Sequence, residues 1–449
     1  MKRWLCLLYM AIGIFSCKQK GDYRALINDP FLYCKTVKKL NDVVLYNNFP
    51  PVIASRNYAY ANIAAYECIA AGDVNFQSLS GQIKHLPPMP KPMDASKVDF
   101  QLAALFSLIK VGNAVTFPEG VLMDYWQELY EKADSAGMPT EVLKHTVAFS
   151  DTIVATILKW SKSDNYAQTR SAEKYSVTAE DGRWVPTPPA YTQALEPHWC
   201  KIRPLVLDSA SQFVPPAPPK FNVSSVSSPF YKELLEVKNV GETLTEEQKH
   251  IAEFFDDNPF NLHVTGHVMY ATKKFSPPGH WMNIVGIAAQ KSGKDFNATV
   301  ASYAATSIAL FDGFIACWYT KYKTNTIRPE SVINKYLDPD WRPYLQTPPF
   351  PSYISGHSVI SNASAEVMTH IFGDNFAFTD TSELEFGIPN RSFSSFRDAA
   401  LEASMSRLYG GIHYRSDLEQ GNVIGQKLGK HILSRLQFQR SQNQLSQNK

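Results

Sequence analysis

The sequence predicts an all-α fold crossed by one long proline-rich excursion. Apolar residues recur at three-to-four spacing through most of the 449 residues, and no stretch of alternating apolar and polar residues rivals that pattern. Between residues 162 and 229, closely spaced prolines forbid long helices, so this part is predicted to run as an extended, loop-rich segment over the helices. An apolar fraction of 44% against 19% charged residues fits a globular protein with a sizeable core.

The predicted helices lie on both sides of this excursion. Before it they cover 54–71, 100–111, 120–136 and 141–161, with Pro118-Glu119 as the start of the third. Helical pattern resumes at Tyr231 and continues through 245–255, 281–289, 298–322, 357–372, 398–409 and 416–436. The tail 437–449, rich in glutamine, serine and asparagine, is expected to be disordered. By length, the chain has room for three domains of about 150 residues or one large helical domain.

Charge excludes some classes of partner. The 44 basic and 42 acidic side chains leave a net charge of +2, so no overall field gathers nucleic acid or an anionic membrane. Any anion binding is therefore expected to be local.

The first segment has the pattern of an export signal. Lys2 and Arg3 precede an apolar stretch, 4–15, that is shorter than the roughly 20 residues needed to span a bilayer. The following Ser16-Cys17 resembles a bacterial lipobox, so we expect residues 1–16 to be a signal peptide cleaved before Cys17. A simply cleaved signal and an uncleaved anchor are the alternatives. We expect an exported protein, a periplasmic or outer-membrane lipoprotein or a secreted one, that contacts the membrane only through its N-terminal lipid.

Two further features are open to simpler interpretations. The apolar segment 298–318 carries polar residues such as Asp312, so a buried core helix is favoured over a membrane span. The cysteines of the mature chain show no metal-type spacing, and their disulfide pairing cannot be assigned from sequence. They are Cys34, Cys68, Cys200 and Cys317.

Lys321 and Arg328 form the first of three segments with chemical potential. Seven residues make two helical turns, so the two cations are expected on one side of a helix, with Pro329 limiting how far it continues. A lone cation at a helix end is usually a solvated surface charge. Lys321 and Arg328 therefore indicate an anion site only in combination with the two segments that follow.

Ser355-Gly356-His357, the second segment, comes immediately before a helical pattern. It places a hydroxyl, an unobstructed backbone N–H and an imidazole at a helix N-terminus, where the helix dipole and unpaired amides favour an anion. Alone, such a triplet is most often a helix cap with a structural histidine.

Arg407 and His413, in the third segment, are six residues apart and would face different sides of one continuous helix. Gly410-Gly411 offers a break that turns both inward. Asp417 lies one turn beyond His413, placed to orient its ring through the far nitrogen if that stretch is helical. Together the three segments supply three cations, a helix N-terminus and two histidines, which suit a tetrahedral or trigonal-bipyramidal oxyanion.

The order Lys-x6-Arg-Pro, Ser-Gly-His and Ser-Arg-x5-His-x3-Asp resembles that of one superfamily, the vanadium-dependent haloperoxidases and type-2 phosphatidic acid phosphatases, which includes bacterial acid phosphatases. The matching residues, 321–417, cover about a fifth of the chain. The resemblance implies two packed helix bundles forming one domain over 17–436, with the oxyanion site within 230–436.

By this resemblance, the oxyanion is vanadate with vanadium in the +5 state. The cations Lys321, Arg328 and Arg407 are implied to neutralise its equatorial oxygens, while Ser355 and the Gly356 amide donate to them.

The resemblance also implies roles for the histidines. His413 is the implied apical vanadium ligand, with Asp417 behind it, and His357 holds the opposite apical oxygen and acts as acid and base. The implied reaction oxidises halide with hydrogen peroxide to hypohalous acid through a peroxovanadate at His413, and a small organic acceptor is a further conceivable partner.

Features outside the shared motifs favour the haloperoxidase branch. Phe350 in the lead-in to Ser355, and Trp318 three residues before Lys321, resemble aromatic residues that line the halide side of the haloperoxidase site. Phe350 and the export signal are most similar to bacterial iodoperoxidases, so iodide is the expected halide. Ile354 departs from the proline found in many members, so we expect the loop before Ser355 to be less rigid than theirs.

Two other functions remain in view. An exported acid phosphatase of the same superfamily would use His413 as the phosphorylated nucleophile, and a helical glycan-binding lipoprotein would need none of the three cationic segments.

Two residue pairs carry weaker signals. His263 and His267 have metal-pair spacing on a helix, although a structural role is favoured. Asp256 and Asp257 offer an acceptor for one of the arginines or, equally, a helix cap.

Overall fold

Helices dominate the structure, a computed structural model that describes residues 22–117, 120–259, 261–265 and 268–440, with the backbone alone for 261–265 and 268–272. The first helices are α1 (Tyr23–Ile27), α2 (Pro30–Tyr46), α3 (Pro51–Gly72), α4 (Phe100–Val115), α5 (Val121–Ser135), α6 (Thr140–Ser161) and α7 (Tyr166–Arg170). Those of the second half are α8 (Pro229–Glu242), α9 (Glu246–Phe254), α10 (Pro277–Ser292), α11 (Phe296–Thr324), α12 (Pro329–Tyr336), α13 (Gly356–Phe372), α14 (Phe396–Tyr409) and α15 (Arg415–Arg435).

Strands are confined to two antiparallel hairpins in the described residues. β1 (Asn261–Thr265) pairs with β2 (Val268–Thr272), and β3 (Phe378–Asp380) pairs with β4 (Arg391–Phe393). The all-α prediction is therefore confirmed.

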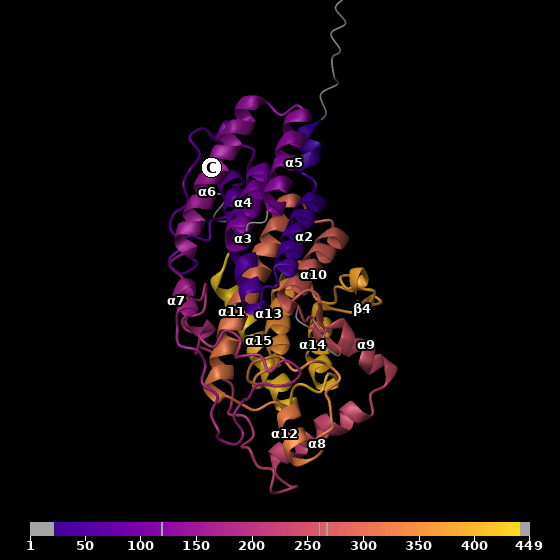
Figure 1. Ribbon diagram of the computed structural model, residues 1–449. Coiled ribbons are helices and arrows are strands. Elements are labelled where there is room, and N and C mark those ends of the chain that lie inside the picture. The colour runs from indigo at the N-terminus through magenta and orange to yellow at the C-terminus, as the bar shows by residue number, and fades with distance from the viewer. Residues whose placement is uncertain (1–21, 118–119, 260, 266–267, 441–449) are drawn as a thin grey trace, which may run out of the picture.

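The helices form two packed bundles that meet along α11. In the first, α3 packs on α4 and α11, and α4 packs on α6; in the second, α13 packs on α15, α14 and α11. Figure 1 shows α3 to α6 at one end of the molecule and α8, α12 and α14 toward the other, with α11 running between them. The predicted two-bundle arrangement is confirmed.

α11 is the central core helix. The Asp295 side chain accepts a hydrogen bond from the backbone N–H of Ala298 (2.7 Å) and starts the helix, and Asn325 ends it in the left-handed conformation at φ 50°. α11 is long and apolar enough to cross a membrane, yet its most apolar window is wholly buried inside the protein. The expected core helix at 298–318 is confirmed.

Three glycines at four-residue spacing let α15 approach α13 closely. They are Gly421, Gly425 and Gly429. A Cβ on Gly421 would lie 2.6 Å from the Cβ of Ser358, and one on Gly425 would collide with the backbone carbonyl of Val359. Since α13 begins with Ser355-Gly356-His357 and α15 with the segment after His413, this close contact fixes two of the three motif segments against each other.

Replacing Gly425 with alanine is expected to lower the free energy of unfolding by about 2 kcal/mol. The steric cost at the Val359 carbonyl outweighs the roughly 1 kcal/mol that alanine gains over glycine within a helix. Urea unfolding followed by circular dichroism measures the change. Val423→Ala, at an exposed position of the same helix, is the matched control and should stay within about 0.5 kcal/mol. Equal effects of the two substitutions would contradict the close-packing explanation.

The proline-rich excursion, 162–229, is hydrogen-bonded to one carboxylate on α11. Asp312, fully buried on α11, accepts backbone hydrogen bonds from Leu205, Val206 and Leu207 at 2.7, 2.7 and 2.9 Å. Burial raises the pKa of Asp312 to about 6 despite these three donors. The excursion holds the short helix α7 and one 3-10 turn, Trp199–Lys201, which packs on α11, and it has no long helix, as predicted.

Several expectations need correction. Helices α1, α2 and α12 were not predicted, and neither hairpin was. His263 lies on β1, so it cannot share a helical face with His267, which lies outside the described residues. Residues 437–440, expected to be disordered, are ordered: Phe76 pairs with Gln439.

Other predictions fall outside the described residues: the signal peptide 1–16, the lipidation site at Cys17, the start at Pro118-Glu119, and 441–449. The question of disulfide pairing is answered for the described residues, where all four cysteines are free thiols: Cys34, Cys68, Cys200 and Cys317.

Candidate active site

Ser355 is the N-cap of α13, as predicted. Its hydroxyl oxygen accepts a hydrogen bond from the Ser358 N–H (3.2 Å), which satisfies one orphan donor of the first turn. Its own backbone N–H donates to the carbonyl of Asp417 (3.0 Å), so the second and third motif segments are joined directly. Gly356 and His357, the first residues of the helix, both face a cavity.

Lys321 and Arg328 come together for a different reason from the one predicted. Lys321 lies in the last turn of α11, which ends at Asn325, and Arg328 is the N-cap of the next helix, α12. Pro329 therefore starts a helix, at the position where its missing N–H costs nothing, instead of limiting one. The pair is brought together by the turn at Asn325 and not by two turns of one helix.

His413 lies between two helices, as the Gly410-Gly411 break predicted. α14 ends at Tyr409, Gly411 adopts φ 73°, and α15 begins two residues after His413. The Nδ1 atom of His413 lies 2.7 Å from Oδ2 of Asp417, so the predicted contact is confirmed. Its geometry is not that of one continuous helix, because Asp417 belongs to the first turn of α15 and reaches back to the loop.

The cations Lys321 and Arg328 donate to neutral acceptors. Lys321 Nζ donates to the carbonyls of Pro351 (2.9 Å) and Ser352 (2.8 Å). Arg328 donates from Nε to the Phe350 carbonyl (2.8 Å) and from Nη1 to the carbonyl of Ile412 (2.7 Å) and to Nε2 of His413 (3.1 Å).

Arg407 follows the same pattern. It donates to the Ser406 hydroxyl (2.9 Å) and to the backbone carbonyls of Phe255 and Asp256. The Asp256 carboxylate instead lies 3.7 Å from Nζ of Lys274. Asp256 and Asp257 were predicted to offer an acceptor for one of the arginines. Asp256 does so for Arg407, but with its backbone carbonyl and not with its carboxylate.

Three buried cations without a paired carboxylate require an anion. Burial lowers the pKa of Lys321 to about 7 and the pKa of both Arg328 and Arg407 to about 10. Within the described residues, none of the three is ion-paired with a carboxylate. Because a buried charge without a counter-charge is costly, an oxyanion in their midst would stabilise all three.

The two histidines are neutral and face the same space. Burial, with Arg328 next, holds the pKa of His413 well below its usual range; its proton therefore lies on Nδ1, facing Asp417, and Nε2 keeps a lone pair. Burial and Arg407 lower the pKa of His357 to about 4. Nε2 of His357 lies 3.5 Å from Oδ2 of Asp257, an ion-pair distance longer than a hydrogen bond.

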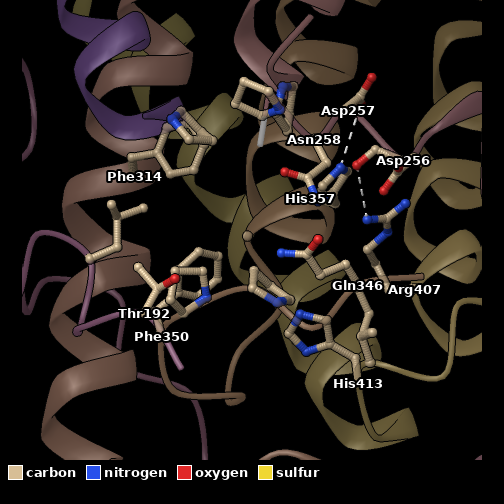
Figure 2. A pocket seen from close by; sticks show the side chains of 18 of the residues that line it. Thr192, Asp256, Asp257, Asn258, Phe314, Gln346, Phe350, His357, Arg407 and His413 are labelled. Atoms are coloured by element: carbon tan, nitrogen blue, oxygen red, sulfur yellow. Dashed lines mark hydrogen bonds and ion pairs between the residues drawn. The ribbon is translucent and has the colours of Figure 1, made fainter. Parts of the chain in front are cut away.

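Of these groups, His357, Arg407 and His413 line a cavity of about 270 Å³, while Lys321 and Arg328 are not among its lining residues. Figure 2 shows His357, Arg407 and His413 on one side of it, with Phe314 and Phe350 across from them. The Trp318 and Phe350 rings, 4.9 Å apart between centroids, both line the wall as predicted.

Sequence reasoning missed three contributors to the site. The proline-rich excursion supplies Leu195, whose carbonyl accepts from Nε1 of Trp318 (3.2 Å), and Thr192 beside it lines the cavity. Ser352 donates to Oδ2 of Asp417 (2.5 Å). A serine next to a proline carries no distinguishing signal, and the excursion could be placed only by its tertiary contacts.

The residues present fit vanadate. Nη2 of Arg328 is buried without a hydrogen-bond partner. An unpaired buried donor of this kind is rare and marks a place where a further acceptor belongs. The lone pair on Nε2 of His413, which faces Nη1 of Arg328, is a donor suited to a metal.

Comparisons with known proteins agree with this geometry. The family described as the VCPO second helical-bundle domain matches residues 301–442. A solved structure titled as the first bacterial vanadium-dependent iodoperoxidase is 42% identical, covers 92% of this chain and 98% of its own, and has a TM-score of 0.87. This chain belongs to the vanadium-dependent haloperoxidases. The resemblance drawn from the three motif segments is therefore confirmed.

More distant haloperoxidases share the fold. A holo-type and an apo-type bacterial vanadium-dependent chloroperoxidase, each 16% identical, give TM-scores of 0.64 and 0.66 over 86% and 87% of this chain and 92% and 94% of theirs. No functionally curated protein matches the chain. Membership of this family implies a vanadate cofactor, with hydrogen peroxide and halide as substrates.

In this haloperoxidase, vanadate affinity is expected to fall as pH rises through about 7. Lys321 carries its charge only below its lowered pKa, so above pH 7 vanadate binding must first return a proton to it. Lys321→Met lacks this dependence. The ratio of the dissociation constants, variant over wild type, should be about 10 to 100 at pH 6 and narrow by about tenfold for each pH unit above 7.

Quenching of tryptophan fluorescence in the apo-protein between pH 6 and 9 measures both constants. Vanadate protonates identically in the two titrations, so its own chemistry cancels in the ratio. A ratio that stays constant with pH would contradict a role for Lys321 ionisation.

Proposed function

We propose that this haloperoxidase oxidises iodide, in preference to bromide and chloride, using hydrogen peroxide and a vanadate bound at His413. The observation that carries the proposal is the set of three buried cations that are bonded only to neutral acceptors and whose charges all act on His413, with Nη1 of Arg328 3.1 Å from its Nε2 atom. The 42% identical bacterial iodoperoxidase supports iodide as the halide.

Each group has a distinct proposed task. Lys321, Arg328 and Arg407 hold the negative oxygens of vanadate, and Ser355 and the Gly356 amide at the start of α13 donate to them. Bound vanadate supplies a Lewis acid that makes hydrogen peroxide open to attack by halide.

The proposed proton transfers belong to the histidines. His357, neutral because its pKa is about 4, accepts a proton from hydrogen peroxide entering the cavity and returns one to the departing oxygen. His413 keeps Nε2 unprotonated because Asp417 binds the Nδ1 proton.

The aromatic wall suits a large and weakly hydrated halide. Phe314, Trp318 and Phe350 offer polarisable ring surfaces on that side of the cavity. Lys321 and Arg328 each lie 5.0 Å from the centre of the Phe350 ring, so their positive charge also favours an anion there. Iodide loses the least hydration on entering such a place and is also the halide that is easiest to oxidise. A modest activation of peroxide therefore suffices for iodide and fails for chloride.

Reconstitution tests the proposal. Apo-protein receives orthovanadate, and oxidation of iodide, bromide and chloride by hydrogen peroxide is measured beside hydrolysis of an aryl phosphate. We expect vanadate-dependent triiodide formation with a lower rate for bromide and none for chloride. Equal rates for all three halides would overturn the iodide preference, and phosphate-ester hydrolysis inhibited by vanadate, without halide oxidation, would favour the acid-phosphatase alternative.

We propose that the protein is an exported lipoprotein anchored through Cys17. The charged start, the short apolar core and the Ser16-Cys17 step support this. Labelling of expressing bacteria with radioactive palmitate should mark the protein, and Cys17→Ser should abolish the label. A labelled Cys17→Ser variant would overturn the proposal.

A further inference from the structure

A second ionic cluster lies behind His357, beyond the residues given a task above. At its centre is His280, in the first turn of α10 and 1% exposed. Its Nδ1 lies 2.8 Å from Oδ1 of Asp257, and its Nε2 lies 2.9 Å from Oδ2 of Asp380 at the end of β3. Both carboxylates are buried.

His280 must be an imidazolium. Each ring nitrogen faces a carboxylate oxygen, and two acceptors are both satisfied only if both nitrogens carry protons. Burial opposes the charge, and so does the positive end of the α10 dipole, but Asp257 and Asp380 together raise the pKa of His280 well above its usual range. Phe255 stacks on the ring (5.5 Å between centroids) and Phe254 meets it edge-on (5.4 Å), so the ring cannot turn away.

Glu383 completes the cluster as a neutral acid. Its side chain is fully buried, neither carboxylate oxygen has a hydrogen-bond partner, and Oε1 is 3.9 Å from Nδ1 of His280. Burial raises its pKa to about 8. Two carboxylates and one imidazolium therefore form the charged core, and Glu383 beside them adds no charge.

Asp257 connects this cluster to the active site. It stands in the loop after α9 with φ 46°, a conformation that aspartate tolerates better than most residues. One of its oxygens binds His280, and the other lies 3.5 Å from Nε2 of His357. Figure 2 shows Asp257 and His413 on opposite sides of His357.

We propose that His280 is a positioning residue for His357, acting through Asp257. The ion-paired chain Asp380–His280–Asp257 holds the Asp257 carboxylate fixed and ionised, and this carboxylate keeps the His357 ring turned toward the cavity. The inference rests on the proposed function, because it assigns His280 a part in the proton transfer at His357.

A metal ion is the competing explanation for the cluster. Ligand atoms of Asp257, His280 and Glu383 lie within 4.8 Å of one another. However, both His280 nitrogens are already at hydrogen-bond distance from carboxylates, so a metal would have to displace a proton and break one of those bonds. The protonated chain is favoured, and metal content becomes one outcome of the test.

The first experiment separates positioning from folding. In His280→Gln we expect kcat for halide oxidation to fall about 10- to 100-fold while the dissociation constant of vanadate, from tryptophan fluorescence of the apo-protein, changes less than about threefold. Asp380→Asn should act in the same direction and serves if His280→Gln does not fold. Glu67→Gln is the matched control, because Glu67 is also a buried carboxylate and accepts hydrogen bonds from Ser78 and Leu79. The kcat of the Glu67→Gln variant should stay at the wild-type value.

A double-mutant cycle gives the decisive comparison. On a His357→Ala background, His280→Gln should cause no further loss of kcat, because the residue it positions is gone. A merely structural defect would multiply the losses, and that result would overturn the proposal. A loss of vanadate affinity equal to the loss of kcat would overturn it as well.

The protonation state can be observed without activity. Apo-protein labelled with ¹⁵N-histidine should show one histidine whose two ring nitrogens stay protonated at pH values well above the usual histidine pKa, and this signal should vanish in His280→Gln. Absence of the signal, or a stoichiometric divalent metal in elemental analysis, would overturn the proposal. If the wild-type protein shows the signal but oxidises no halide, the proposed function is wrong, and the positioning role of His280 is wrong with it. If the wild-type protein oxidises halide but lacks the signal, only the role of His280 is wrong.

Discussion

His413→Ala is expected to abolish vanadate-dependent halide oxidation, with a loss of at least about 1000-fold. Nε2 of His413, 3.1 Å from Nη1 of Arg328, is the atom proposed to bind vanadium, and Nε2 of His357, the other histidine that lines the cavity, faces Asp257 instead. Halide oxidation with orthovanadate and hydrogen peroxide measures the rate, and fluorescence titration measures the accompanying loss of vanadate affinity.

The control is His370→Ala, an exposed histidine in the last turn of α13. It removes an imidazole from the same helix that His357 begins, without touching the cavity, and should leave both measurements unchanged. Full activity in His413→Ala would mean that vanadate is held elsewhere. A loss in both variants would point to damaged folding.

Much of the fold was predictable because periodicity is a local property. The helices at 54–71, 141–161 and 357–372 each show a sustained apolar pattern, and each is present within a few residues of its predicted bounds. α2 was missed although its signal exists. Asp29 caps the helix, Pro30 occupies its first position, and the buried side chains along it recur at helical spacing.

The site was predictable in its parts and not in its connections. Ser355 and His413 could be singled out because short motifs carry them. What holds Arg407 could not be foreseen in full, because besides the adjacent Ser406 hydroxyl its acceptors are two backbone carbonyls about 150 residues away. The His280 cluster has no local signature at all, since Asp257, His280 and Asp380 meet only through the packing of α10 against β3 and the loop after α9.

The proximity of Lys321 and Arg328 was predicted correctly, but for the wrong structural reason. Seven-residue spacing led to the expectation of one helical face for Lys321 and Arg328, whereas a left-handed residue, Asn325, ends the helix between them. The correct pairing followed from the wrong geometry because a tight turn and two helical turns both return the chain to the same side. Spacing therefore predicts proximity better than it predicts the backbone path.

Asp417→Asn is expected to weaken vanadate binding by about 10- to 100-fold. Oδ2 of Asp417 accepts the Nδ1 proton of His413 at 2.7 Å, and a carboxylate enforces that tautomer because it has no proton to give at neutral pH. An asparagine amide can turn its NH₂ toward Nδ1 and move the proton to Nε2, where it blocks the lone pair. Binding of vanadate to the apo-variant, followed by fluorescence or calorimetry, measures the loss.

Ser352→Ala is the matched control, because Ser352 donates to the same Oδ2 atom (2.5 Å) and its hydroxyl lies 3.4 Å from Nδ1 of His413, much farther than the 2.7 Å of Asp417. Burial raises the pKa of Asp417 to about 6, and the hydrogen bond from Ser352 opposes that rise. Ser352→Ala should therefore raise the pKa of Asp417 further. We expect the Ser352→Ala variant to bind vanadate less tightly only at mildly acidic pH, where Asp417 becomes protonated. Asp417→Asn has no carboxylate to titrate and should be weak at every pH. If Asp417→Asn regained wild-type affinity above pH 7, orientation of His413 by Asp417 would not be what keeps Nε2 available.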